Sequence, residues 1–399
     1  MGREVERPEE DRPDQPGRLV VASRHEGRSG HTELWAERPL CPRNEDNKTG
    51  YPLGAFMGAT RLNETRLNLL PTLGPQSVSV VLTNACNLRC LTCWSYSPLR
   101  KELPMADWRR KRLGRALLTP LFAELAALGT ERVIFTGGGD PLAHPECLEV
   151  FADARQAGLK VTLISNLTLV RDREAFLALG LNTILANFSC ADPETYVAFH
   201  PGRSAADFYT LIALLRDVVA AGTQLKLVFV VCAVNCHVLE KALLLAKELG
   251  ASVQFKLMSA IEETVSLVLS ENQRTTLFAQ RAHLESLGAS ANLEAFYTEL
   301  SGSAPDRFPI DEVGCFAGHW YARVDGDANV RFCCNPDSEL TLGNLNEVSF
   351  TELWRSQEWH VLRTRLRSGD FLPGCERCGK FDLNLKVKQL IRPHERGRL

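Results

Sequence analysis

The sequence predicts an α/β protein whose core is a partial (β/α)6 TIM-like barrel, followed by a small, cysteine-rich C-terminal domain. Six short apolar runs alternate with longer amphipathic runs between about residues 76 and 260. Several of the amphipathic runs end in glycine, which commonly stops a helix. After about residue 310 the pattern changes to short runs, turns and clustered cysteines. Alternating strands and helices are typical of a parallel sheet covered by helices.

The predicted strands are rich in β-branched and apolar residues. They are Val78–Leu82, Arg132–Thr136, Val161–Ser165, Thr183–Phe188, Leu225–Val231 and Val253–Leu257. Helices are predicted between them, among others at Leu113–Leu128, Pro145–Ala157, Ala206–Ala220 and Val238–Leu249. Catalytic groups of such barrels lie at the C-terminal ends of the strands, so chemical motifs are expected directly after each strand.

Length and composition exclude several classes of partner. The chain has 399 residues, 45% of them hydrophobic, and a formal net charge of -2. This balance offers no basic surface for nucleic acid or for an anionic membrane. No stretch resembles a signal peptide or a membrane span, so we expect a cytoplasmic protein. The predicted divisions are a partly disordered N-terminal extension over residues 1–74, a core over 75–305 and a C-terminal domain over 306–399.

A first set of cysteines follows the first predicted strand. Cys86, Cys90 and Cys93 have the spacing C-x3-C-x2-C. Cytosolic cysteines in clusters are more often metal ligands or catalytic groups than disulfides. Three thiolates at this spacing can bind three irons of a 4Fe-4S cluster and leave the fourth iron open. A zinc site is the alternative, but no paired second half lies nearby.

The segment from about residue 77 to 260 resembles the radical S-adenosylmethionine (radical SAM) superfamily. The cysteine motif is followed by Trp94, and the second strand by Thr136-Gly-Gly-Gly-Asp-Pro-Leu142, which resembles the family's Gly-Gly-Glu-Pro motif. Asp140 replaces the usual Glu. The resemblance implies that Cys86, Cys90 and Cys93 hold a catalytic 4Fe-4S cluster. This cluster would cleave SAM to a 5′-deoxyadenosyl radical that abstracts a substrate hydrogen atom.

The same resemblance implies a set of SAM-binding residues at successive strand ends. An aromatic residue after the third cysteine lies near the adenine, and an arginine pairs with the SAM carboxylate, which suits a guanidinium fork. Taken singly, each residue is typical of an ordinary turn, cap or surface position, and only their shared placement favours a SAM site. The set is Trp94, Gly138, Gly139, Asp140, Asn166, Ser189 and Arg203.

A second set of cysteines occupies the C-terminal region. Cys315, Cys333, Cys375 and Cys378 have the order C-x17-C-x41-C-x2-C, and the Asp325-Gly-Asp turn predicts a β-hairpin between the first two. A structural zinc site is the alternative. The region resembles the SPASM and Twitch domains, which implies a second, auxiliary 4Fe-4S cluster. Adjacent residues of a strand point to opposite sides, so only one of Cys333 and Cys334 is expected to ligate, and the spacing favours Cys333.

Three functions remain open on the sequence alone. The main hypothesis is oxidation of a small polar, carbohydrate-like substrate with help from the auxiliary cluster. The alternative is a peptide-modifying or epimerising maturase. A zinc-binding or electron-transfer module is the third, but it does not explain the strand-end motifs. The expected partners are a small-molecule or peptide substrate and a flavodoxin- or ferredoxin-type electron donor.

Three further residues have a functional and a simpler interpretation. Cys190 and Cys236 follow predicted strands and could donate a hydrogen atom, although a small buried hydrophobic residue is the simpler interpretation of each. His200 could contact substrate or act as a base, although a loop histidine without a role is the simpler interpretation.

Overall fold

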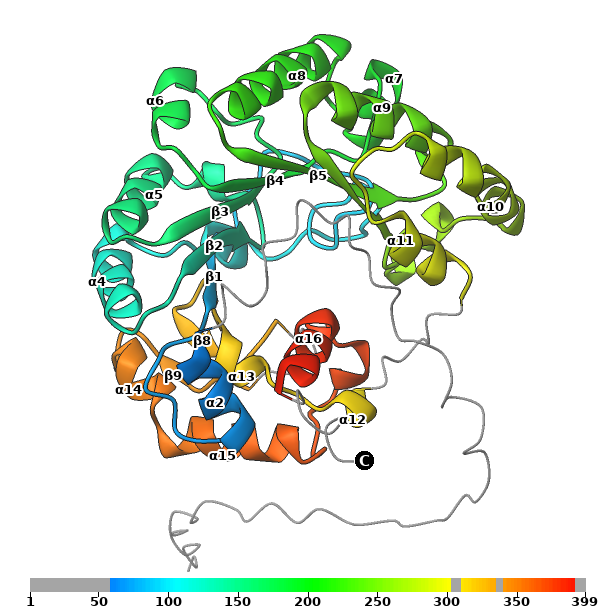
Figure 1. Cartoon of the computed structure of the whole chain (residues 1–399). Coiled ribbons are helices and arrows are strands. Elements are labelled where there is room, and N and C mark those ends of the chain that lie inside the picture. Colours follow the sequence, from blue (N-terminus) through cyan, green and yellow to red (C-terminus); the bar gives the residue numbers. More distant parts are fainter. Residues whose placement is uncertain (1–57, 303–309, 335–339, 392–399) are drawn as a thin grey trace, which may run out of the picture. The chain divides into compact units, whose positions relative to one another are not determined.

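The structure, a computed structural model, describes residues 58–302, 310–334 and 340–391. The chain divides into two units, residues 1–56 and 57–399, and all described residues belong to the second. Its strands form one curved sheet in the order β6-β5-β4-β3-β2-β1-β7-β8-β9 (Figure 1). The bounds are β1 Ser77–Thr83, β2 Arg132–Gly137, β3 Lys160–Ser165, β4 Thr183–Asn187, β5 Gln224–Val231, β6 Ser252–Leu257, β7 Tyr321–Val324, β8 Asn329–Arg331 and β9 Gly343–Asn344.

Strands β1 to β6 are parallel, and each is followed by helical structure on the outer side of the arc (Figure 1). This confirms the predicted α/β barrel-like core and all six predicted strands. The longer elements of this part are α4 Arg115–Ala127, α5 Cys147–Gln156, α6 Arg173–Ala178, α7 Pro193–Phe199, α8 Ala205–Ala220, α9 Leu239–Leu249, α10 Glu271–Ser286 and α11 Leu293–Leu300. The short ones are α3 Ala106–Arg110, η1 Pro141–Ala143, η2 Cys236–Val238 and η3 Glu262–Leu267.

The core lies between the sheet and its outer helices. Alternate strand residues such as Val80, Phe135 and Leu163 are fully buried there, and their neighbours in sequence point to the opposite face. The helices end where glycine was expected to end them. Gly129 and Gly250 have φ values of 74° and 68°, a conformation that glycine adopts without strain.

The C-terminal region extends the same sheet. The predicted hairpin is present, since β7 and β8 are antiparallel with Val324 opposite Val330. Strand β7 pairs in parallel with β1, which joins the hairpin directly to the barrel. The remaining elements are α12 Ile310–Val313, α13 Ala317–Trp320, α14 Phe350–Trp354, α15 Gln357–Arg367, η4 Cys375–Arg377 and α16 Phe381–Ile391. The domain boundary near residue 305 stays a prediction.

The helix α2 (Ala59–Leu67) was not predicted, because the sequence before residue 75 has no clear apolar period. It is held by buried polar side chains instead. Arg61 is 3% exposed, donates to the carbonyls of Gly74 and Gly129, and lies over the ring of Trp320. The rest of the predicted N-terminal extension, residues 1–57, lies outside the described residues. No helix in the described ranges is long and apolar enough to cross a lipid bilayer.

Candidate active site

The loop after β1 carries Cys86, Cys90 and Cys93 as free, partly buried thiols. The pKa of Cys86 is raised to about 11, chiefly by burial and to a smaller extent by the charges of Asp140 and Cys93. The pKa of Cys90 is also raised. Burial is the largest cause, and the charges of Cys93 and Cys86 are smaller ones. The three sulfurs therefore lie close enough to interact.

Backbone amides face two of these sulfurs. The amide of Leu88 donates to Cys86 Sγ at 3.5 Å, and that of Tyr96 to Cys93 Sγ at 3.2 Å. Thiols with raised pKa values stay protonated at neutral pH, and the positive charge of bound iron would favour their thiolate forms. The donor set thus fits three ligands of an iron–sulfur cluster.

The glycine run after β2 packs against this loop. A Cβ atom on Gly139 would lie 1.9 Å from the carbonyl oxygen of Ala85, and one on Gly138 would lie 2.4 Å from Asn84 Oδ1. The amide of Asp140 donates to the same Ala85 carbonyl at 2.8 Å. A side chain is excluded at Gly139 because two backbones touch there, and at Gly138 because the side chains of Asn84 and Trp108 fill the space.

The carboxylate of Asp140 connects the ends of β2 and β3. It is 4% exposed and accepts hydrogen bonds from Ser165 Oγ at 2.9 Å, the Asn166 amide at 2.7 Å and the Leu142 amide at 2.9 Å. Burial raises its pKa. Asn166 in turn donates through Nδ2 to Asn87 Oδ1 in the cysteine loop, at 3.3 Å. The Asp140 side chain is therefore engaged with protein donors, and it positions the neighbouring loops.

Ser189 follows β4 with a positive φ of 47°. Its Oγ accepts a hydrogen bond from the Val230 amide at 3.0 Å, and its carbonyl accepts one from Asn235 Nδ2 at 2.9 Å. Asn235 is fully buried, also donates to the Val230 carbonyl, and accepts from the Cys232 amide. The sequence analysis missed Asn235, and its only signal was a polar residue shortly after a predicted strand.

Trp94 and Arg203 lie at different places around the barrel mouth. Trp94 is 55% exposed, and its Nε1 donates to the Ser259 carbonyl at 3.0 Å, which connects the cysteine loop to the end of β6. Arg203 forms a long ion pair of 3.9 Å with Asp207 of α8. The structure thus brings Gly138, Gly139, Asp140 and Asn166 against the cysteine loop, whereas contacts with other elements hold Ser189 and Arg203.

The sequence left both a functional and a simpler interpretation open for Cys190, Cys236 and His200. All three residues are buried. His200 is 2% exposed, with Nδ1 3.0 Å from the Tyr196 carbonyl, and burial lowers its pKa to about 4. Cys190 is fully buried and Cys236 is 6% exposed. These surroundings favour the simpler, structural interpretation of each.

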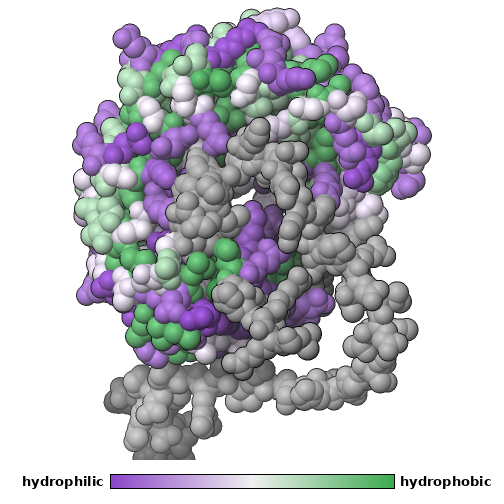
Figure 2. Space-filling view, viewed as in Figure 1, coloured by the Kyte–Doolittle hydropathy of each residue, from purple (hydrophilic) through white to green (hydrophobic). Residues whose placement is uncertain are grey.

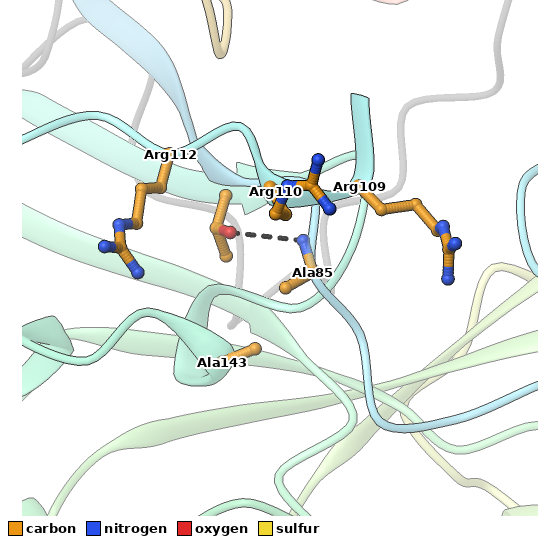
Figure 3. A pocket seen from close by; sticks show the side chains of 6 residues that line it. Ala85, Arg109, Arg110, Arg112 and Ala143 are labelled. Carbon is orange, nitrogen blue, oxygen red and sulfur yellow. Dashed lines mark hydrogen bonds between the residues drawn. The ribbon is translucent and has the colours of Figure 1, made fainter. Parts of the chain in front are cut away.

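A shallow pocket of about 270 Å³ borders the start of the cysteine loop (Figure 3). It is lined by Thr83, Ala85, Arg109, Arg110, Arg112 and Ala143, and Thr83 Oγ1 accepts from the Ala85 amide at 3.1 Å. None of the predicted SAM-binding residues lines it, so we do not assign SAM to this pocket. Its character is basic, since three arginines surround it.

The second cysteine site is assembled from distant segments. Burial raises the pKa of Cys315, and the charges of Cys333, Cys378 and Cys375 raise it further, so these four sulfurs lie near one another. Asn384 of α16 donates to Cys378 Sγ at 3.6 Å and accepts from the Phe316 amide at 2.7 Å. Through these two hydrogen bonds Asn384 connects Cys378 to the segment that directly follows Cys315.

The neighbouring Cys334 also lies close to this site. The pKa of Cys378 is raised mainly by burial, next by the charge of Cys375, and then by the charge of Cys334. The choice between Cys333 and Cys334 stays a prediction. No three His, Cys, Asp or Glu side chains in the described ranges gather tightly enough for one metal ion. Cysteines of a cubane cluster each bind a different iron and stand farther apart, so the arrangement is compatible with a cluster.

A barrel with cysteines after its first strand and a further cysteine site beyond its last fits an iron–sulfur enzyme. Comparison with known families gives the same result. Residues 80–230 match the model of the radical SAM superfamily, and residues 315–379 match that of an iron–sulfur cluster-binding domain, SPASM. The chain belongs to the radical SAM superfamily and has a C-terminal SPASM-type domain. It is an enzyme that uses SAM, a 4Fe-4S cluster and auxiliary iron–sulfur chemistry.

Relatives cover most of the chain. A PqqA peptide cyclase from Gluconobacter oxydans is 27% identical over 316 residues, which are 76% of this chain and 83% of the relative. An AdoMet-dependent heme synthase from Methanosarcina barkeri is 26% identical over 329 residues, 77% of this chain and 88% of the relative. Among solved structures, Streptococcus suis SuiB bound to precursor peptide SuiA has the same fold. Its TM-score is 0.56 at 13% identity, over 76% of this chain and 70% of SuiB.

Proposed function

We propose that this chain modifies a peptide substrate by radical SAM chemistry. The supporting observation is its similarity to the PqqA peptide cyclase over 83% of that enzyme's length. This similarity favours the maturase alternative over the oxidation of a carbohydrate-like molecule, which was the main hypothesis from sequence. A tetrapyrrole is the second candidate substrate, because the AdoMet-dependent heme synthase aligns over a similar share of the chain.

In this proposal Cys86, Cys90 and Cys93 hold the SAM-binding cluster, and Cys315, Cys333, Cys375 and Cys378 hold the auxiliary one. When bound, SAM and its cluster supply one-electron reductive cleavage of SAM and the hydrogen-atom abstraction that follows. The chain's own residues position these groups. Asp140 fixes the loops after β2 and β3 through three hydrogen bonds, and Trp94 connects the cysteine loop to β6.

The basic pocket beside the cysteine loop supports an acidic electron donor such as a flavodoxin. Arg110 and Arg112 are exposed there (Figure 3). Surface charges of one sign steer a partner of opposite sign and act mainly on the association rate. Arg110→Glu with Arg112→Glu should therefore slow flavodoxin-driven SAM cleavage and spare cleavage driven by dithionite. An equal loss with both reductants would contradict this donor surface.

The peptide proposal is tested with anaerobically reconstituted enzyme, SAM and reductant. Small peptides encoded beside the gene serve as substrates, and coproporphyrin serves as the tetrapyrrole. Mass spectrometry should reveal a peptide that has lost two hydrogens or exchanged one for solvent deuterium, with 5′-deoxyadenosine formed alongside. Cys147→Ala, outside both cysteine sets, is the matched control and should keep the activity. Turnover of coproporphyrin without modification of any peptide would overturn the proposal.

A further inference from the structure

The strands of the described sheet carry basic residues and no acidic one. The cations are Arg132, Lys160, Lys226, Lys256, Arg323 and Arg331. Strands that carry cations and no acid contribute a positive potential to the sheet. Its interior location concentrates that potential, because low-dielectric walls focus field lines.

Three of these cations point away from the outer helices. Lys226 stands between the buried Leu225 and Leu227, and Arg323 between the buried Ala322 and Val324. Lys256 follows Phe255, which is 1% exposed under the helices. Side chains alternate along a strand, so all three face the inside of the arc.

Lys256 is the next-to-last residue of β6, Arg323 is the third residue of β7, and Lys226 is the third of the eight residues of β5. Figure 1 shows α16 inside the arc of the sheet. In Figure 2 hydrophilic described residues are visible near the centre of the view, inside the arc of the sheet. Burial lowers the pKa of Lys226, and the charges of Lys256 and of Lys386 on α16 lower it further. The side chains of Lys226, Lys256 and Lys386 therefore lie close enough for their charges to interact.

Some of the surrounding charge is already balanced. Arg331 pairs with Asp325 at 2.8 Å, and Glu299 of α11 is the carboxylate that faces Lys256. Lys380 lies 3.8 Å from the centroid of the Tyr321 ring and beside Cys334 and Cys333. Its charge therefore offsets that of the auxiliary cysteines.

Lys226 and Arg323 remain without such compensation. Neither forms an ion pair with a carboxylate within the described residues, and Arg323 Nε is buried with no hydrogen-bond partner there. An unpaired charge that is partly withdrawn from water costs free energy. A bound ligand that carries negative charge would offset this cost at Lys226 and Arg323.

We propose that Lys226 and Arg323, with Lys256 beside them, bind carboxylate groups of the substrate, so that the peptide carries Glu or Asp next to the reacting residue. This inference rests on the proposed peptide function and names the substrate class of the same site. Charge-assisted hydrogen bonds from two strands would hold the peptide across the barrel interior. The reacting residue would then lie between the cysteine loop and the C-terminal cysteines, within reach of both.

The test measures binding to the reconstituted holoenzyme in the presence of SAM. The probes are a fluorescein-labelled peptide of alternating Glu and Gly and its Gln–Gly counterpart. Anisotropy should show the Glu peptide binding at least about tenfold more tightly, with Lys226→Gln and Arg323→Gln each weakening it roughly tenfold. The control Arg216→Gln removes the same charge from the outer face of α8 and should leave binding unchanged. Iron content and the unfolding midpoint show that each variant is folded.

Equal binding of the two peptides, or an equal loss in Arg216→Gln, would overturn the inference. Citrate, a small tricarboxylate, separates it from the proposed function. Binding of citrate that depends on Lys226, with no peptide bound, would support the carboxylate site and refute the peptide function. Modification of an uncharged peptide with an unaltered KM in Lys226→Gln would support the peptide function and overturn this inference.

Discussion

The two cysteine sites of this molecule are built in opposite ways. The first lies in the eight residues from Cys86 to Cys93, in one loop at the end of a single strand. The second combines Cys315 before α13, Cys333 after β8, and Cys375 and Cys378 at η4. The first site therefore depends on the neighbouring strand-end loops that pack against it, whereas the second exists only when three segments are folded together.

The surroundings of the sites differ accordingly. The cysteine loop is held by backbone contacts of Gly139 and of the Asp140 amide with Ala85, and by Asn166, which the buried carboxylate of Asp140 positions. The C-terminal site is held by side chains, among them Asn384 and the buried Arg363, which donates to the carbonyls of Gly318 and Trp354. Loss of the cysteine ligands should therefore affect chemistry at the first site, and both metal content and folding at the second.

The largest effect is expected from the first site. Replacing Cys86, Cys90 and Cys93 together by Ala should reduce 5′-deoxyadenosine formation to background, because no ligands remain for the SAM-binding cluster. The auxiliary iron should remain, since its ligands lie elsewhere. Iron analysis should show about four irons fewer per chain than the wild type. Unchanged 5′-deoxyadenosine formation would refute this ligand assignment.

The second site should lose both metal and stability. Cys375→Ala with Cys378→Ala should remove about four irons per chain and lower the unfolding temperature, because metal binding contributes to folding. SAM cleavage without substrate should persist. Cys333→Ala and Cys334→Ala form the matched pair, and the first should lose iron while the second keeps it. The reverse result would make Cys334 the ligand.

The sequence could predict what is local and periodic. All six strands followed from apolar runs, and the hairpin followed from its Asp325-Gly-Asp turn. The role of α2 could not be predicted, because its buried residues are Arg61, Glu64 and Thr65, which read as a solvent-exposed face. Asn235 was missed for a related reason, since its hydrogen bonds join two strand ends that only the folded sheet brings together.

Asp140 offers a smaller test of how the first site is held. Asp140→Ala leaves the Ser165 hydroxyl and the amides of Asn166 and Leu142 without their acceptor. Buried donors that lose an acceptor cost about 1–3 kcal/mol each, so we expect the free energy of unfolding to fall by about 3 kcal/mol. Denaturant unfolding measures the change. The exposed Asp370→Ala on the C-terminal side is the control, and an effect of equal size there would contradict the role of Asp140.

The smallest expected effect is a pH dependence of the C-terminal region. His319 is 3% exposed, and burial lowers its pKa to about 3, helped by the charges of Arg363, Arg367 and His360 and opposed by a hydrogen bond to the Leu69 backbone. A histidine whose pKa is lower in the folded state stabilises the fold fully above its unfolded value of about 6.5. This contribution is lost as the pH falls through the folded value.

A pH of 5 is about 1.5 units below the pKa of a histidine in the unfolded chain. The contribution of His319 to the free energy of unfolding should therefore be about 2 kcal/mol smaller at pH 5 than at pH 7. Denaturant unfolding of the holoenzyme at both pH values measures this loss. His319→Gln should reduce the pH dependence by that amount, because glutamine does not titrate. His283→Gln, at an exposed position of α10, should keep the wild-type dependence. Since cluster loss at low pH affects all three proteins alike, equal slopes for the wild type and His319→Gln would mean that His319 takes up its proton without opening this part of the fold.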